Sequence, residues 1–157
     1  MTTIAGVACR ALDTPAERKL YFSGRGADGT EHRPEIVLNA SDLGAAQRER
    51  RRIMDGCNGV APLVMLRLEG LLADTFTEAR THLTEYRGRR GADESTVRYV
   101  GTPAGLAGLI ADIGAAEVAD GVILVPLDAP GSSDLIARHT IPSLRERGMR
   151  IEEGASV

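Results

Sequence analysis

The sequence predicts an α/β fold built from strand-then-helix units. Two segments, 35–39 (EIVLN) and 121–126 (GVILVP), are apolar, of strand length and bounded by turn residues. Each is followed by a helix signal, and a further helix begins at Pro103. Because strands that alternate with amphipathic helices connect through right-handed crossovers, we expect a parallel sheet, either open or part of a barrel.

The first third of the chain contains one complete unit. Residues 3–9 (TIAGVAC) read as a short strand, Thr14 and Pro15 as the opening of a brief helix, and 23–34 as a surface loop rich in glycine and charge. After the strand at 35–39, Ser41 is the expected N-cap of a helix that runs through Ala45 to about residue 54.

The middle of the chain predicts a second unit and the start of a third. A strand lies within 60–73, and Thr75 with Glu78 has the spacing of a capping box for a helix that Gly88 would end. A short extended piece at 97–100 precedes a helix capped by Thr102, with Pro103 at its first position. The apolar face of that helix carries Leu106, Leu109, Ile110 and Ile113.

The last third repeats the pattern. The continuous apolar run at 121–126 is typical of a strand buried on both faces of a parallel sheet. A loop leads to Ser133, which can cap a helix, and Pro142 begins a final helical turn or two.

Length, composition and charge limit the possible classes. The 157 residues fit a single domain spanning 1–157, with 43% hydrophobic and 26% charged residues. The net charge of -3 argues against nucleic-acid and membrane partners, and solvated helix ends explain the arginine clusters at 48–52 and 87–90 better than phosphate contact does. Without a signal-like start, a long apolar span or a disulfide framework, we expect a cytoplasmic protein.

Few residues suggest chemistry. His32, His82 and His139 have no metal-ligand spacing, so we expect no metal site, and the residues alone leave the catalytic groups unassigned. One strand-to-helix turn, at 40–44 (ASDLG), could present free backbone N–H groups and a hydroxyl to a phosphate. Such turns are also ordinary connectors in α/β folds, and the charge of Asp42 would repel an anion.

Several motifs in fixed order resemble the C-terminal half of the luciferase-like flavin-dependent monooxygenases, in particular the branch related to nitrilotriacetate monooxygenase. The motifs are VGTP at 100–103, ADGV at 119–122, a proline-containing loop at 126–130 and IPSLRERG at 141–148. Upstream, RPEIVLNASDLGAAQRER at 33–50 and ADTFTEAR at 73–80 are fainter matches, and Tyr21 and Phe22 resemble a preceding hairpin.

The resemblance implies the second half of a (β/α)8 barrel and a flavin, either FMN or a deazaflavin. In the family, the turn after the first matching strand helps to hold the flavin phosphate. That role falls here on Asn39, Ala40, Ser41 and Gly44. No catalytic residue carries over.

Family members are about twice as long, so this chain corresponds to a truncated luciferase-like domain. Half a barrel leaves unpaired strand edges and an apolar inner face that must be covered. A homodimer, a heterodimer with another luciferase-like chain or a rearranged compact sheet would each cover them, and we expect the homodimer. Two functions remain open: a flavin-dependent monooxygenase or oxidoreductase component that binds FMN or a deazaflavin, and a non-catalytic binding or assembly subunit that has lost flavin chemistry and binds no cofactor.

Overall fold

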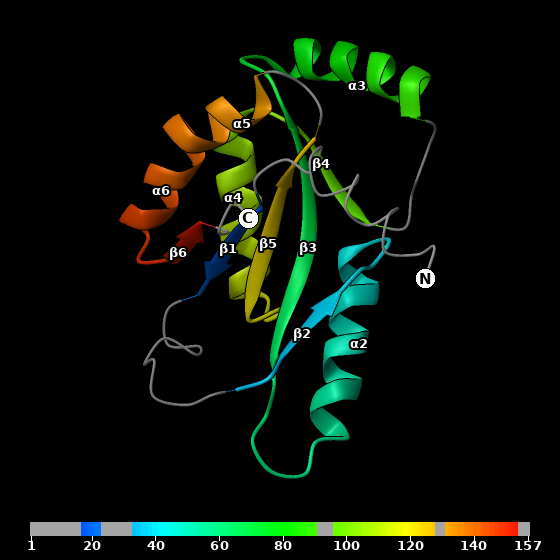
Figure 1. Ribbon diagram of the computed structural model, residues 1–157, viewed down its shortest axis with the longest axis vertical. Coiled ribbons are helices and arrows are strands. Elements are labelled where there is room, and N and C mark those ends of the chain that lie inside the picture. Colours follow the sequence, from blue (N-terminus) through cyan, green and yellow to red (C-terminus); the bar gives the residue numbers. More distant parts are fainter. Residues whose placement is uncertain (1–16, 23–32, 91–95, 128–130, 154–157) are drawn as a thin grey trace, which may run out of the picture.

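The long strand β3 (Leu63–Leu72) organises a six-stranded sheet (Figure 1). The computed structural model describes residues 17–22, 33–90, 96–127 and 131–153. The other strands are β1 (Arg18–Tyr21), β2 (Glu35–Leu38), β4 (Val97–Gly101), β5 (Gly121–Pro126) and β6 (Arg150–Glu153). The helices are α2 (Leu43–Asp55), α3 (Phe76–Arg90), α4 (Pro103–Ala115), α5 (Ser132–Leu135), the π-helical turn η1 (Ile136–Thr140) and α6 (Ile141–Glu146).

The sheet is mixed, whereas the sequence predicted only parallel strands. Strands β2 and β4 pair with the first and second halves of one edge of β3, β5 pairs with the other edge, and all three run parallel to β3. Next to β5 lies β1, antiparallel to both β5 and β6. The four-residue strand β1 thus occupies the edge of β5, and the four-residue strand β6 extends the sheet beyond β1.

The strand order is therefore β2-β3-β5-β1-β6, with β4 beside β3. Over the residues that the structure describes, this is an open sheet and not the consecutive half of a closed barrel. The expectation of parallel strand-helix units is confirmed for β2 to β5, while β1 and β6 add antiparallel strands that the sequence did not predict. At the edge of β5, the antiparallel strand β1 of this chain takes the position beside it.

The back face of the sheet, defined by Val64, Leu66 and Leu68, carries the main core. Helix α4 lies behind β5 in Figure 1, and α2 and the α5 to α6 segment flank it. Alternation along β3 directs every second side chain to this face, where it meets apolar residues of these helices. The helical contributors that are buried in this core are Ala46, Leu106, Ala107, Ile110, Ile113, Ile136, Ile141 and Leu144.

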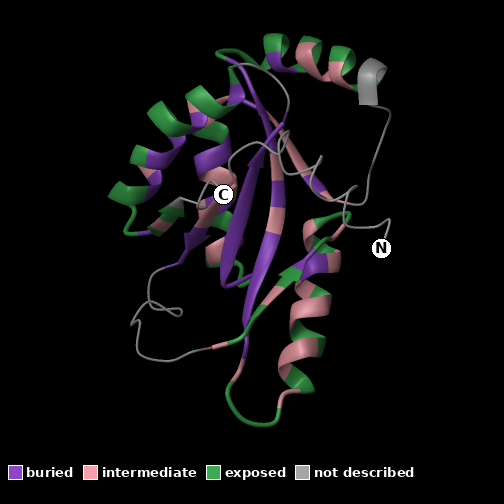
Figure 2. Cartoon of the chain, in the orientation of Figure 1, coloured by how far each residue is buried: buried purple, intermediate pink, exposed green. Residues whose placement is uncertain are grey.

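The front face, defined by Met65, Arg67 and Glu69, faces the viewer in Figure 1. At the carboxyl end of the strands it is covered by α3, whose Ala79 packs with Leu71 and Leu127. At the amino end it holds a second buried cluster of Tyr21, Leu63, Met65, Ile123 and Val125. Figure 2 shows β5 and most of β3 as buried along their length.

Several predicted boundaries need correction. The N-cap of α2 is Asp42 and not Ser41, because the Asp42 carboxylate accepts the backbone N–H of Ala45. Helix α3 continues past Gly88, and α5 begins after Gly131 instead of being capped by Ser133. The predicted strand at 3–9, the helix opening at 14–15 and most of the loop at 23–34 lie outside the described residues.

Other predictions are confirmed. Thr75 Oγ1 accepts the N–H of Glu78 at 3.2 Å, and Thr102 Oγ1 accepts the N–H of Gly105 at 3.3 Å, so both predicted caps form. The face of α4 that the sequence assigned to the core is the buried one, with Leu109 partly buried at its margin.

Candidate functional site

The predicted phosphate-binding residues lie together at the turn between β2 and α2. Asn39, Ser41 and Gly44 are exposed, and Ala40 is half-buried. Strand β2 ends opposite Leu66, in the middle of β3, while the carboxyl ends of β4 and β5 lie near the end of β3. The turn is therefore set back from the edge where β3, β4 and β5 end.

The carboxylate of Asp42 occupies the start of α2. Its Oδ1 accepts the Ala45 N–H at 2.7 Å, and its backbone oxygen accepts the Ala46 N–H at 3.1 Å. The Ser41 hydroxyl donates to the other carboxylate oxygen, Asp42 Oδ2, at 3.4 Å. A Cβ placed on Gly44 would stand 3.2 Å from Asp42 Oδ1 and 3.3 Å from Arg48 Nη1, so these two side chains fill the space above the first helical turn.

This arrangement does not fit a flavin phosphate. A phosphate at a helix N-terminus uses free N–H groups and the positive end of the helix dipole. Here the Asp42 carboxylate takes the Ala45 N–H and already supplies the negative charge. An incoming phosphate would meet the negative charge of that carboxylate at the start of the helix.

A second group of polar side chains spans the amino end of the front face. Tyr21 donates from its hydroxyl to Glu35 Oε1 at 2.7 Å, and Lys19 Nζ donates to Glu35 Oε2 at 2.8 Å. Strands β1 and β2 are separated by β3 and β5, a distance of about 14 Å in a flat sheet. The side chains of Tyr21 and Glu35 therefore reach toward each other from opposite sides of the face, and Tyr21 packs in one buried cluster with Met65.

The contacts of this group shift two pKa values in opposite directions. The pKa of Glu35 is lowered, chiefly by the hydrogen bond from Lys19, with partial burial opposing and the hydrogen bond from Tyr21 adding to the effect. The pKa of Tyr21 is raised well above its ordinary value, first by burial and then by its hydrogen bond to the Glu35 carboxylate. A phenol held in this way is a fixed donor and a poor acid at neutral pH.

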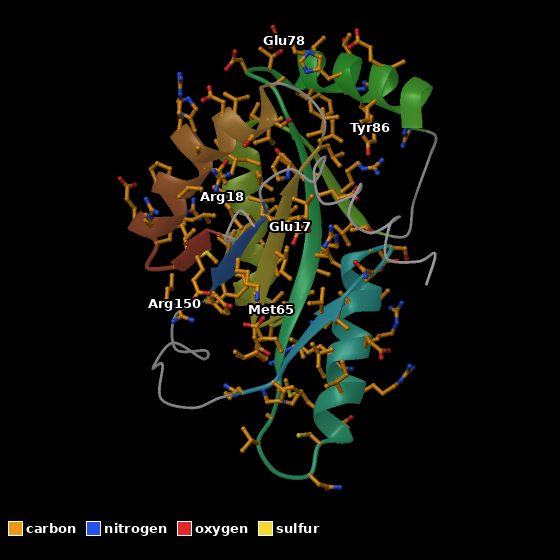
Figure 3. All side chains as sticks on the ribbon, viewed as in Figure 1. Glu17, Arg18, Met65, Glu78, Tyr86 and Arg150 are labelled. Carbon is orange, nitrogen blue, oxygen red and sulfur yellow. The ribbon has the colours of Figure 1, made fainter. Side chains whose placement is uncertain are left out.

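The rest of the front face carries further ion pairs. Arg67 contacts Glu17 at 2.8 Å, and Arg98 contacts Glu69 at 2.9 Å, the latter pair being largely shielded from water. The Arg98 guanidinium also lies 5.3 Å from the ring centre of Tyr86 on α3. Figure 3 shows Glu17 and Met65 over this face and Tyr86 on α3.

Sequence reasoning missed this front-face group. The available signal was period-two alternation in β3, where Met65, Arg67, Glu69 and Leu71 share one face. Recognising their partners required the strand order, because Glu17, Glu35 and Arg98 come from three other segments. Glu17, Glu35 and Glu69 each form an ion pair with an arginine or a lysine, an arrangement that favours a structural role over acid-base chemistry.

The arginine cluster at 48–52 does not form one common surface. Arg50 Nη2 contacts the buried Asp120 Oδ1 at 2.9 Å, while Asp120 Oδ2 accepts the Val64 N–H at 3.0 Å. Arg52 pairs with Glu49 within α2 at 3.0 Å. Arg50 thus ties α2 to the start of β3 and β5, so a solvated helix end does not describe it.

The remaining candidates show no assembled site. Over the described ranges, no group of three His, Cys, Asp or Glu side chains could hold a metal ion. His82 Nδ1 is buried and makes no hydrogen bond with any residue that the structure describes. His139 is exposed, and Cys57 Sγ donates to the Val60 carbonyl at 3.4 Å. His32 and Cys9 lie outside the described residues. In that same part of the chain, no helix is both long and apolar enough to cross a membrane.

The fold is that of part of a luciferase-like monooxygenase. The structure matches riboflavin lyase RcaE, solved with modified FMN and the substrate riboflavin, with a TM-score of 0.60 and 21% identity over 74% of this chain and 40% of that chain. It matches EDTA monooxygenase EmoA from Chelativorans sp. BNC1 with a TM-score of 0.59 and 15% identity over 73% and 40%.

Long-chain alkane monooxygenase LadA gives a TM-score of 0.53 and 19% identity over 73% of this chain and 37% of that chain. The chain therefore spans about two-fifths of the length of the structures it resembles. No family model and no curated protein sequence matches it. These matches support the predicted resemblance at the level of the fold.

Proposed function

We propose that the chain is a component of a flavin-dependent oxidoreductase, to which it contributes the C-terminal strand-helix units of a luciferase-like fold. The observation that carries this proposal is the match over 73–74% of the chain to flavin-linked enzymes, of which RcaE was solved with modified FMN. The chain spans about two-fifths of those structures, so the proposal assigns it one part of a flavin site and leaves the remainder to structure that these 157 residues do not contain.

The assembly would have to hold the flavin without phosphate contacts from the β2 to α2 turn. The turn from Asn39 to Gly44 presents a carboxylate at the start of its helix. We propose a homodimer as the simplest assembly and a heterodimer with another luciferase-like chain as the other form. The edges of β2, β4 and β6 carry backbone groups that could pair with such a partner.

The test is a visible absorption spectrum of the purified protein together with its mass in solution, before and after incubation with FMN or riboflavin. A flavin spectrum that comigrates with a species of twice the chain mass supports the proposal. Protein that retains no flavin, alone or with any copurified luciferase-like chain, would contradict it.

A non-catalytic assembly subunit is the second candidate, and two observations favour it. The carboxyl end of the strands, where such folds bind their ligands, is covered by α3 through Ala79, Leu83 and Tyr86. The front-face carboxylates described above are held by Arg67, Arg98 and Lys19. Copurification with a full-length luciferase-like chain whose activity does not require Glu69 or Arg98 would favour the assembly subunit over the flavin-dependent oxidoreductase component.

A further inference from the structure

We infer that Asp42 excludes the flavin phosphate from the β2 to α2 turn, so that this chain does not favour FMN over its dephosphorylated form, riboflavin. The inference rests on the proposed function for its ligand class. It concerns a specificity-determining residue, not a catalytic one.

The first step concerns hydrogen-bond donors. In an uncapped helix, the first N–H groups are free to bind an anion. In α2 the Ala45 N–H is already bound to Asp42 Oδ1 at 2.7 Å, and the Ala46 N–H is bound to the Asp42 carbonyl oxygen at 3.1 Å. A phosphate would have to displace the side-chain cap to gain the Ala45 N–H, whereas the Ala46 N–H makes the first intrahelical bond and would not be free in any case.

The second step concerns space. The position above Gly44, where a ligand could approach the backbone most closely, is bordered by Asp42 Oδ1 and Arg48 Nη1. The glycine therefore leaves room for this chain's own side chains. Gly44, which the family resemblance placed among the phosphate-binding residues, therefore accommodates the helix cap instead.

The third step concerns charge. A carboxylate about 4 Å from a phosphate opposes binding by roughly fivefold in affinity per unit charge at an exposed site. The Asp42 side chain is exposed, so dissolved salt should reduce this effect. Riboflavin carries no phosphate and would not experience it.

The experiment compares the wild type with two variants by flavin fluorescence titration. Asp42→Asn removes the charge and keeps a capping oxygen, whereas Asp42→Gly removes both and still permits helix initiation. We expect the wild type to bind FMN and riboflavin with affinities within about twofold of each other. Each variant should tighten FMN binding by roughly fivefold or more, less at high salt, and leave riboflavin binding unchanged. A wild type that prefers FMN by fivefold, or variants that leave FMN affinity unchanged, would overturn the inference.

A second measurement separates this inference from the proposed function. If no variant binds either flavin, the proposed function fails, and the inference is then decided by titrating inorganic phosphate while monitoring amide NMR signals. The Ala45 amide, which the substitution frees, should shift with phosphate in Asp42→Gly and stay unmoved in the wild type. Equal shifts in both proteins, or none in Asp42→Gly, would show that Asp42 does not control access.

Discussion

Tyr21 helps to close the amino end of the front face. Its ring is buried beside Met65, and its hydroxyl is fixed by Glu35 from the far side of the front face. Arg150 lies 4.5 Å above the centre of the same ring. The amino end of the front face is thus closed by side chains of this chain. The requirement for a covering partner, which the sequence led us to expect, is reduced there.

The Glu35 interaction predicts a pH dependence of stability. Its folded-state pKa is lowered, chiefly by Lys19, so the stabilisation is fully present above the unfolded-state value near 4.5 and is lost as the pH falls through the folded-state pKa. Thermal unfolding followed between neutral pH and pH 3 should show a steeper decline for the wild type than for Glu35→Gln. Parallel curves for the two proteins would contradict the assignment.

Tyr21→Phe isolates the phenolic hydrogen bond. The ring remains in the cluster with Leu63 and Met65, while the bond to the Glu35 carboxylate is lost. We expect a loss of about 1–2 kcal/mol in the free energy of unfolding, as is usual for hydrogen bonds to charged groups. Urea denaturation measures it, and a variant as stable as the wild type would show that water replaces the tyrosine.

Gly121 is required by close approach of backbone atoms. A Cβ at this position would clash with the Leu20 carbonyl oxygen and lie 2.7 Å from Met65 Sδ. Because a backbone carbonyl in a paired strand cannot move aside, Gly121→Ala should cost at least about 2 kcal/mol. Gly108→Ala, where the added Cβ meets no atom within 4 Å, is the matched control and should be neutral or stabilising.

At the scale of elements, strands and helices with strong local signals were predictable. Thr102 and Pro103 specify where α4 begins, and the apolar run of β5 specifies a buried strand, because both signals lie within a few residues of sequence. The strand β6 was not predicted, since RIEE has no apolar run and forms only by pairing with β1. The cap at Asp42 was missed because Ser41 beside it is an equally good capping residue.

Ser132 joins α5 to the end of β3. Its buried hydroxyl accepts the Leu72 N–H at 2.9 Å and faces the Leu72 carbonyl at 3.4 Å. Ser132→Ala leaves a buried N–H without its partner, so we expect about 1–3 kcal/mol of destabilisation, measured by urea unfolding. The neighbouring Ser133 is exposed, and Ser133→Ala should cost less than about 0.5 kcal/mol. Equal losses in the two variants would place the effect in the local backbone instead of the hydroxyl.

At the scale of the whole molecule, the sequence pattern identified the α/β class and the luciferase-like resemblance but not the sheet order. Alternation of strands and helices is identical in an open sheet and in part of a barrel. What distinguishes them here is the pairing of Arg18 to Tyr21 with β5, a contact about 100 residues away along the chain. The turn between β2 and α2 could be located from its motif, whereas the carboxylate cap on α2 required the position of the Asp42 side chain.

The proposed homodimer makes a prediction for the folded molecule in solution. Association stabilises the folded state by mass action, so each tenfold rise in protein concentration should raise the apparent free energy of unfolding by about 1.4 kcal/mol. Urea midpoints measured over a hundredfold range of concentration would therefore rise for a homodimer. Midpoints that do not depend on concentration would exclude it and favour a heteromeric partner or a self-sufficient open sheet.

Val37 on the edge strand β2 is 44% exposed, so Val37→Lys tests whether that edge takes part in the proposed dimer. The concentration dependence should disappear in this variant if β2 pairs with a second copy and persist if β4 or β6 does.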